Sequence, residues 1–152
     1  MAFETQILNN RQAYHEFYIL DKYEAGAALV GTEVKSIMAG RIQLKESYVQ
    51  IKDGEVWLYG AHISHYSHGN INNHDVLRPR KMLLHRKEIE KLQKETTQKG
   101  MTLVVTSIYW KNGRIKFEIG VAKGKKLHDK RETEMRKTIE KETQAQLKEK
   151  LR

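Results

Sequence analysis

Apolar and polar residues alternate in several segments of the chain, and this alternation predicts its clearest strands. Before the dipeptide Asp53-Gly54, the apolar residues Val49 and Ile51 stand at every second position. Apolar residues also stand at every second position after it. In that second segment the apolar residues are Val56 and Leu58. Asp-Gly suits a two-residue type I′ turn, which fixes the register of a hairpin, so the four apolar residues should share the face that points to the core. The opposite face is expected to carry Tyr48, Gln50, Trp57 and Tyr59.

A second hairpin is predicted around Asn112-Gly113, another dipeptide that suits a type I′ turn. Earlier in the chain, Tyr14 to Leu20 is rich in aromatic and β-branched residues and predicts a first strand, continued or bulged as far as Val30. In the second hairpin we expect one face to carry Thr106, Ile108 and Trp110 opposite Ile115, Phe117 and Ile119.

Two helices are expected between these strands. Thr32 is a suitable N-cap for one or two helical turns that end at Gly40. Arg86 to Gln98 has apolar residues at helical spacing, and Gly100 stands where a left-handed residue commonly ends a helix. An amphipathic helix should therefore lie between the two hairpins.

Together these elements indicate a fold that is mainly β with helices. About six strands interrupted by a helix are typical of a closed β-barrel of the oligonucleotide-binding type with inserted helices. A chain of 152 residues is long enough for one such domain and too short for two ordinary ones. We therefore expect one barrel domain with an appended segment.

Charge is distributed unevenly along the chain. The 28 Lys and Arg exceed the 19 Asp and Glu, and the net charge of +9 favours polyanions such as nucleic acid or an anionic membrane. From Lys123 onward there are 11 basic and 6 acidic residues, few large apolar residues and no aromatic residue. Such a segment cannot bury enough apolar surface to fold alone. We therefore place the barrel domain at residues 1–123 and a basic C-terminal tail at residues 124–152.

Several classes of protein are disfavoured by the composition. No apolar run approaches the roughly 20 residues of a membrane span, and residues 1–10 lack the pattern of a signal peptide. The chain has no cysteine, which fits a reducing compartment. We therefore expect a cytoplasmic protein with no membrane partner.

No motif in the sequence predicts catalysis, a cofactor or a metal site. His62, His65, His68 and His74 are close in sequence, but their spacing matches no common cage and no cysteine accompanies them. The sequence also has no nucleophile elbow and no phosphate-binding glycine loop. We expect a protein that is not an enzyme and that needs no cofactor and no metal.

Two basic clusters point to RNA. Arg78, Arg80 and Lys81 follow a polar loop, and Lys-Gly-Lys-Lys at residues 123–126 follows the last predicted strand. A basic run can serve solubility alone, but two clusters near aromatic residues favour RNA binding. Rings on which bases can stack are offered by Tyr48, Trp57, Tyr59 and Tyr66.

The tail has a four-residue repeat of mostly apolar positions. On a helix, steps of four drift around the axis, so these residues form no tight seam and the helix is weak alone. We expect a segment that is disordered when free and becomes helical in a groove of RNA or protein, with a frayed tail without a role as the alternative. The repeated positions are Met135, Ile139, Thr143, Leu147 and Leu151.

Beyond these patterns, an ordered set of motifs resembles the SmpB family of SsrA-binding proteins. No single motif is decisive, but their order is specific, and the set runs from about Asn10 to Arg131. It comprises Gly31-Thr-Glu-Val-Lys-Ser36, Ala39-Gly40, Asp75 with Arg78-Pro-Arg-Lys81, Tyr109-Trp-Lys-Asn-Gly113, Ala122-Lys-Gly-Lys-Lys126 and His128-Asp-Lys-Arg131.

The resemblance implies a function in trans-translation, the rescue of bacterial ribosomes stalled on messages without a usable stop codon. Members of this family bind the tRNA-like domain of tmRNA through the barrel and are delivered with elongation factor Tu. The tail is expected to become helical on the ribosome, in the empty mRNA channel next to the decoding centre. The implied partners are thus tmRNA, the small ribosomal subunit with its RNA, and elongation factor Tu, and the chain itself is expected to be a monomer.

Residue by residue, the resemblance implies two binding sides. The RNA-binding residues expected to face tmRNA are Asn10, Arg11, Glu33, Val34, Lys35, Ser36, Arg78, Arg80, Lys81, Lys123, Gly124, Lys125 and Lys126. Those expected to face the ribosome are His128, Asp129, Lys130, Arg131, Met135, Ile139 and Leu147. The competing hypothesis is a general single-strand RNA-binding or chaperone module of the oligonucleotide-binding type.

Overall fold

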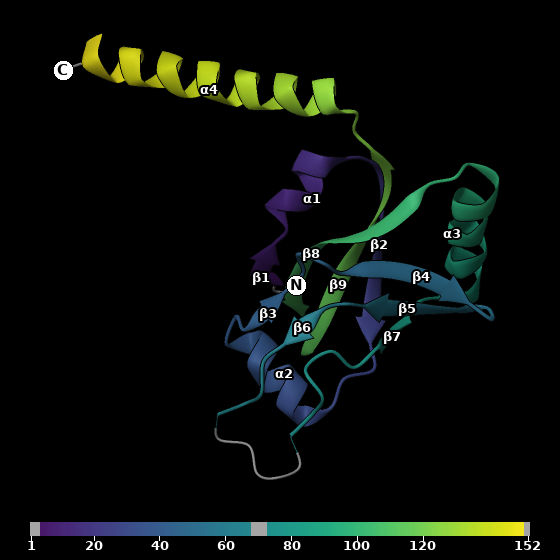
Figure 1. Ribbon diagram of the computed structural model, residues 1–152. Coiled ribbons are helices and arrows are strands. Elements are labelled where there is room, and N and C mark those ends of the chain that lie inside the picture. Colours follow the sequence, from purple (N-terminus) through teal and green to yellow (C-terminus); the bar gives the residue numbers. More distant parts are fainter. Residues whose placement is uncertain (1–3, 68–72, 151–152) are drawn as a thin grey trace.

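The computed structural model (Figure 1) describes residues 4–67 and 73–150; for residues 127–129, 133 and 147–150 it describes the backbone alone. In chain order the elements are β1 (Glu4–Asn9), α1 (Arg11–Glu16), β2 (Phe17–Ala27), α2 (Gly31–Met38), β3 (Ile42–Gln43), β4 (Tyr48–Lys52), β5 (Glu55–Tyr59), β6 (His62–Ile63), β7 (Arg80–Leu83), α3 (Arg86–Gln98), β8 (Thr102–Lys111), β9 (Arg114–Gly124) and α4 (Leu127–Lys150).

Within the described residues, six strands pair side by side into a closed ring. Their order is β8-β4-β5-β7-β2-β9, and β9 pairs in turn with β8, so the ring closes; all of these pairings are antiparallel. β1 pairs with the second half of β8, and β3 pairs with β6 as a separate short ribbon. The prediction of a mainly β fold with about six main strands and inserted helices is confirmed at this level.

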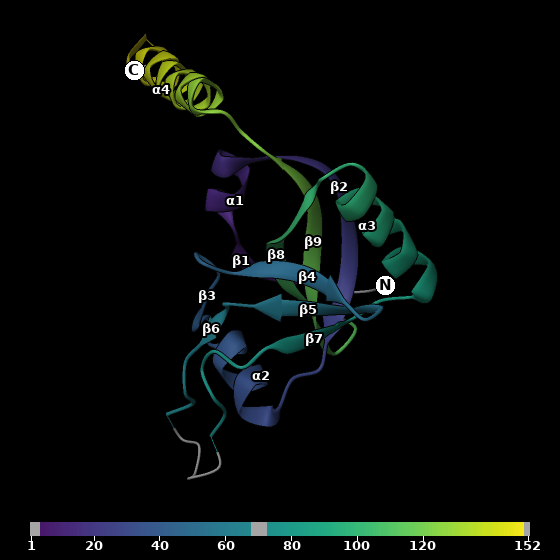
Figure 2. The same ribbon diagram turned by 45° about the vertical axis from the view of Figure 1, so that its right-hand side comes forward.

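The core fills the inside of this ring. Leu58 of β5, Ile108 of β8 and Phe117 of β9 are fully buried there, because inward side chains from opposite sides of the ring meet. α2 lies across one end of the ring and α3 along one flank, and each adds one fully buried apolar side chain to the core, Ile37 and Leu92 respectively. α1 and α4 lie at the opposite end from α2, as Figures 1 and 2 both show.

Both predicted hairpins are present with the expected turns. Asp53 and Asn112 have φ of 53°, and the glycine after each also has positive φ, as a type I′ turn requires. In the first hairpin Ile51 pairs with Val56, so the predicted register is confirmed. The expected inner residues are buried or packed against the core, while Tyr48 on the outer face is exposed.

The second hairpin differs from its predicted register beyond Ile108. Ile115 and Phe117 pair with the expected residues, but Ile119 pairs with Val105, and Thr106 lies within a bulge of β8. The Thr106 hydroxyl donates to Glu118 Oε1 at 2.8 Å. The alternation of residues in the sequence could not reveal this bulge, because an extra residue shifts the pairing without changing the apolar pattern nearby.

Gly120 of β9 leaves room for side chains of both neighbouring strands. A Cβ at Gly120 would stand 2.8 Å from Thr106 Cγ2 and 3.2 Å from Ile19 Cγ2, so both side chains pack onto the bare backbone of β9. A second bulge, in β2 between Ile19 and Asp21, lies opposite Val121 and Ala122 of β9. Bulges increase local twist, and these two flank the strand on which the ring closes.

The first predicted strand is wrong at both ends. Tyr14 belongs to α1, and the strand, β2, begins at Phe17 and ends at Ala27 instead of Val30. α1 forms because Asn10 acts as its N-cap: the Asn10 side chain accepts a hydrogen bond from the Ala13 N–H. Neither α1 nor β1 was predicted.

The two predicted inserted helices are present. α3 has the predicted bounds, and Gly100 follows it with φ of +65°. α2 begins at Gly31, so Thr32 lies inside the helix and is not its N-cap. The Val30 N–H at the helix start donates instead to Glu33 Oε1 at 3.0 Å.

α4 extends away from the ring of strands (Figure 1). It begins three residues after β9 ends, and most of its described side chains are exposed. His15 of α1 contacts it, with Nε2 2.8 Å from Glu134 Oε1. Among the described helices, α4 included, none combines the length and apolar character that a membrane span requires.

Candidate nucleic-acid interface

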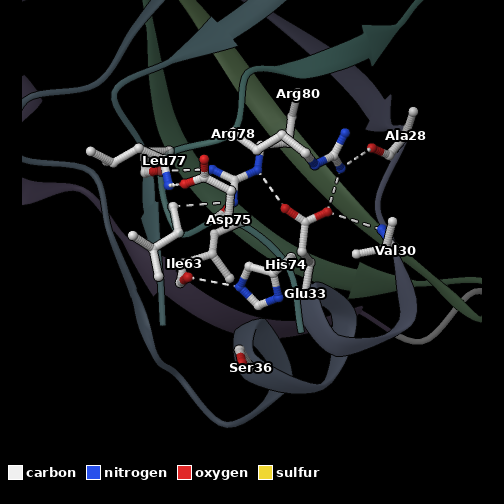
Figure 3. Close-up of polar contacts among 12 residues, drawn as sticks. Ala28, Val30, Glu33, Ser36, Ile63, His74, Asp75, Leu77, Arg78 and Arg80 are labelled. Atoms are coloured by element: carbon white, nitrogen blue, oxygen red, sulfur yellow. Dashed lines mark hydrogen bonds and ion pairs between the residues drawn. The ribbon is translucent and has the colours of Figure 1, made fainter. Parts of the chain in front are cut away.

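A buried carboxylate stands at the corner where α2 meets β7 (Figure 3). Glu33 lies in the first turn of α2 and is fully buried. Its Oε2 accepts from Arg80 Nε at 2.6 Å, and its Oε1 accepts from Arg78 Nη2 and from the Val30 N–H. Both oxygens are therefore used within the protein.

Arg80 ties this carboxylate to the loop before β7. The Arg80 side chain is fully buried, and its Nη1 donates to the Ala61 carbonyl at 2.7 Å. Its Nη2 donates to the carbonyls of Asp75 at 3.3 Å and Val76 at 3.2 Å. Because the guanidinium presents a rigid fork of donors, these bonds fix the loop relative to α2 and β7.

The charged form of the Glu33 carboxylate is favoured at this corner. Burial pushes the pKa of Glu33 upward, but hydrogen bonds from Arg78, the Val30 N–H and Arg80 outweigh it, so this pKa is lowered. One carboxylate faces two guanidinium groups, and the Arg78 side chain is 36% exposed. One side of the Arg78 guanidinium, which also donates to the Ala28 carbonyl at 3.2 Å, is thus held at the surface.

The structure separates the predicted tmRNA-facing residues of this region into two groups. Glu33, Ser36 and Arg80 are fully buried, and the Ser36 hydroxyl donates to the Ser64 carbonyl at 2.7 Å. Their contact with RNA stays a prediction; in this structure the polar groups of all three side chains have partners within the protein. Val34 is half-buried and packs against the core.

The remaining cations of this region are accessible. Lys35 is exposed and its Nζ lies 5.3 Å from the centre of the Tyr66 ring. Lys81 is partly exposed and pairs with Glu55 at 3.1 Å. Lys35 and Arg78 both line an open cavity of about 470 Å³ beside the start of α2. These lysines and Arg78 are the part of the first basic cluster that can meet a phosphate.

Asn10 and Arg11 lie at the other end of the ring. The Asn10 Nδ2 donates to the Val105 carbonyl at 2.8 Å, and its Oδ1 caps α1, so this side chain joins α1 to β8. Arg11 follows it as an exposed cation. The structure therefore assigns Asn10 a structural contact and leaves Arg11 facing solvent.

The second basic cluster stands where β9 gives way to α4. Lys123, Gly124 and Lys126 are exposed, whereas Lys125 is partly buried. The Lys125 N–H donates to the Glu16 carbonyl at 2.9 Å, and its Nζ donates to the Tyr14 carbonyl at 3.0 Å. Lys125 thus fastens the end of β9 to α1, while its neighbours face outward.

The predicted ribosome-facing residues all lie in α4. Met135 is 64% and Ile139 57% exposed, which is a large apolar exposure for a helix with so few apolar residues. Arg131 is exposed and Lys130 half-exposed. The remaining predicted residues have side chains outside the described part of the structure: His128, Asp129 and Leu147.

One polar cluster at the surface was not predicted. The Tyr109 hydroxyl donates to Glu24 Oε2 at 2.6 Å, and Lys111 Nζ donates to the same oxygen at 3.1 Å. The hydrogen bond from Tyr109 lowers the pKa of Glu24, and burial together with this bond raises the pKa of Tyr109. Glu24 and Tyr109 are 85 residues apart in the sequence. They meet because β2 and β8 both pair with β9, and the sequence alone does not reveal these pairings.

The histidines form no metal site in the part of the chain that the structure describes, where no three potential ligands gather. His74 Nε2 lies 2.8 Å from the Ile63 carbonyl, and its Nδ1 lies 2.8 Å from the Thr32 hydroxyl. A carbonyl oxygen only accepts, so Nε2 carries a hydrogen and His74 links α2 to β6. His68 lies outside the described residues.

Comparison with known proteins places the chain in a family. The model of the SmpB protein family matches residues 7–149. The SsrA-binding protein of Acetivibrio thermocellus is 53% identical over 146 residues, covering 96% of this chain and 95% of the relative. That of Ligilactobacillus salivarius is 52% identical over 145 residues, covering 95% of this chain and 94% of the relative.

A solved structure is also similar. Its description reads "tmRNA-SmpB: a journey to the center of the bacterial ribosome", and the matching chain is 44% identical with a TM-score of 0.67. The match covers 81% of this chain and 87% of that chain. On the family model and on relatives about half identical over nearly the whole length, the chain belongs to the SmpB family.

Proposed function

We propose that this protein binds tmRNA and brings it to stalled ribosomes for trans-translation. The observation that carries the proposal is the similarity, in both sequence and structure, to a chain described together with tmRNA and the bacterial ribosome. Accessible cations lie at both ends of the ring and give the protein phosphate contacts at two separate places: Lys35 and Arg78 at and beside α2, and Lys123 and Lys126 where β9 ends.

The RNA bound by the ring of strands is the tRNA-like domain of tmRNA. In this proposal the ring acts as a barrel of the oligonucleotide-binding type, and the buried Glu33 and Arg80 hold the surface cations in position without touching RNA. Arg78 is the clearest example, because one edge of its guanidinium is bound to Glu33 while part of its side chain stays exposed. A rigid cation loses less entropy on binding a phosphate than a mobile lysine does.

The tail from residue 124 onward serves the ribosome. We propose that α4 is disordered in the free protein and helical in the empty mRNA channel near the decoding centre, where ribosomal RNA neutralises its cations. The exposure of Met135 and Ile139 supports a helix completed by a partner, because apolar side chains with no covering surface gain little from helix formation alone.

The same proposal includes the setting of this function. The protein acts as a cytoplasmic monomer, is delivered together with elongation factor Tu, and is a binding protein that performs no catalysis. The high identity to proteins named for SsrA binding supports a binding role.

Truncation after His128 tests the division between ring and tail. This variant keeps Lys123 to Lys126 and the whole ring, so we expect it to fold and to bind tmRNA with only a modest loss of affinity. Peptide tagging of stalled chains in a reconstituted translation system should collapse. Full tagging by the truncated protein would contradict a ribosomal role of the tail.

A triple change to serine at Met135, Ile139 and Leu147 tests the helix in the channel. Tagging should fall while tmRNA affinity stays unchanged, because these side chains act only once the helix has formed against its partner. The matched control changes Gln144, Ala145 and Gln146 to serine, at exposed positions of the same helix outside the repeat. If both triple variants tag equally well, the apolar positions have no special role.

The second candidate is a general single-strand RNA-binding or chaperone module. The observation in its favour is the stacked pair of the exposed Tyr48 and the half-buried Tyr59 on the outer face of the ring. Affinities for the tRNA-like domain and for an unrelated RNA of equal length, measured at the same salt concentration, separate the two. Equal affinities would favour the general module over the tmRNA-specific protein.

A further inference from the structure

An aromatic face lies on the outside of β4, β5 and β7, defined by Tyr48, Gln50, Trp57, Tyr59 and Lys81. The strand register sets it out in rows, because paired residues point to the same side. Tyr48 pairs with Tyr59 in one row. In the next row Gln50 pairs with Trp57, and Trp57 pairs with Lys81.

The rings of this face are held at the surface. The Tyr48 and Tyr59 rings are stacked, with centroids 5.4 Å apart and an interplanar angle of 23°, and Tyr48 is 49% exposed. Trp57 and Tyr59 are half-buried, and neither ring packs against the core cluster. Figures 1 and 2 show the three strands at the front of the molecule with no helix across them, whereas α2 and α3 cover other parts of the ring.

The chemistry of this face fits unpaired bases better than a protein surface. It offers flat rings, one amide that can both donate and accept hydrogen bonds, and a cation, while the aliphatic residues of β4 and β5 point inward and Leu83 at the end of β7 is exposed. Protein partners are usually anchored by tightly packed apolar pockets. Stacking on aromatic rings beside a lysine is instead the arrangement by which single-stranded nucleic acid is bound.

The face is also separate from the basic cluster at residues 123–126. That cluster follows β9 at the end of the ring near α1 and α4, whereas β4 and β5 run across the front (Figure 2). Lys81 pairs with Glu55, and both side chains are more than 40% exposed, so a phosphate can exchange with the carboxylate in water. One RNA can therefore reach the cluster through phosphates and the aromatic face through bases.

We propose that the aromatic face is a stacking platform for two or three unpaired bases of bound RNA. The inference rests on the proposed function in taking RNA as the partner. It adds a site at Tyr48, Trp57 and Tyr59 that binds single-stranded RNA in preference to paired RNA. Lys81 holds a phosphate at the edge of the platform, and Gln50 hydrogen-bonds to a base edge.

The test uses the full chain and two probes, a single-stranded oligouridine and a fully paired RNA duplex of the same length. Tyr48→Ala and Trp57→Ala should each weaken binding of the oligouridine about ten-fold, since one base–ring stack is lost, and should leave duplex binding unchanged. Tyr48→Phe keeps the ring and should bind like the wild type. Leu20→Ala, at an exposed apolar side chain on β2, is the matched control.

The outcomes separate this proposal from the proposed function. If tmRNA binding by the wild type is intact but Tyr48→Ala and Trp57→Ala bind oligouridine as the wild type does, the platform is overturned and the proposed function stands. If the wild type fails to prefer tmRNA while the variants lose oligouridine binding, the stacking platform is supported and the proposed function is contradicted. Variants that keep RNA affinity and lose cross-links to a protein would show that the face binds protein instead. Thermal unfolding confirms that each variant is folded.

Discussion

Glu33 and Glu134 both face a basic side chain, yet one is sealed inside the protein and the other lies in water. Glu33 is fully buried between Arg78 and Arg80, whereas Glu134 in α4 is 63% exposed beside His15. A buried charge must be neutralised where it stands, because no water can solvate it. An exposed charge remains open to exchange with a partner. The buried corner therefore determines shape, and the tail keeps its charges for binding.

Replacing Glu33 by glutamine should have the largest effect on folding. The change leaves two guanidinium groups, one of them fully buried, without their carboxylate, which should cost about 3–5 kcal/mol of unfolding free energy. Urea unfolding measures this loss. Glu140→Gln, at an exposed position of α4, serves as the control and should change stability very little.

This expectation alters how a binding defect at Glu33 is interpreted. If the Glu33 carboxylate contacts RNA, replacing it lowers the affinity of the protein for RNA but not its stability. If the carboxylate is a buried structural group, replacing it lowers both, because the fold that positions the RNA-binding residues is weakened. If Glu33→Gln unfolds at the same urea concentration as the wild type, the buried network contributes no net stability and the contrast with Glu134 fails.

Tyr109→Phe should have an intermediate effect that depends on pH. Removing the hydroxyl deprives Glu24 of its shortest hydrogen bond, at a cost of about 1 kcal/mol because the Glu24 carboxylate is partly exposed. Folding lowers the pKa of Glu24 below its ordinary value of 4.5. The stabilisation is therefore fully present above pH 4.5 and is lost as the pH falls through the pKa that Glu24 has in the folded protein. Unfolding free energies of both proteins between pH 7 and pH 3 should therefore converge on the acidic side. A gap that stays constant with pH would show that the hydroxyl acts through packing.

Glu134→Gln should have the smallest effect. The contact with His15 is exposed, so its loss should change the unfolding free energy by about 0.5 kcal/mol or less. Differential scanning calorimetry at pH 6 and pH 8 measures this. A large decrease in stability would mean that α4 is an integral part of the folded domain, contrary to the proposed division near residue 124.

Local signals in the sequence were sufficient for the hairpins and for α3. The dipeptides Asp53-Gly54 and Asn112-Gly113 determine their turns by backbone conformation alone, and the bounds of Arg86–Gln98 follow from spacing and Gly100. Such features need no knowledge of the rest of the fold. Thr106 shows the contrast, because its bulge is a feature of the pairing of β8 with β9, where its methyl group packs over Gly120.

The candidate site was predictable only as a set of charges. The basic residues near Arg78 and Lys123 were visible in the sequence, but their burial was not. Glu33 and Arg80 are 47 residues apart, and only the closed ring brings α2 against β7 so that Arg80 turns inward. A basic residue in such a motif can thus be a buried structural residue or an exposed phosphate-binding residue. The sequence pattern is the same for both.

Gly124 and the two residues after it give the molecule a mechanical property. Gly124 still pairs with Phe17 in the sheet and Lys125 anchors the chain to α1, so a change of direction between the ring and α4 falls on the backbone after Lys125. α4 has 24 residues and would be about 36 Å long when fully helical. A rotation of about 30° at this joint would move its far end by roughly half that length, so a small local change would sweep the tail through a wide arc.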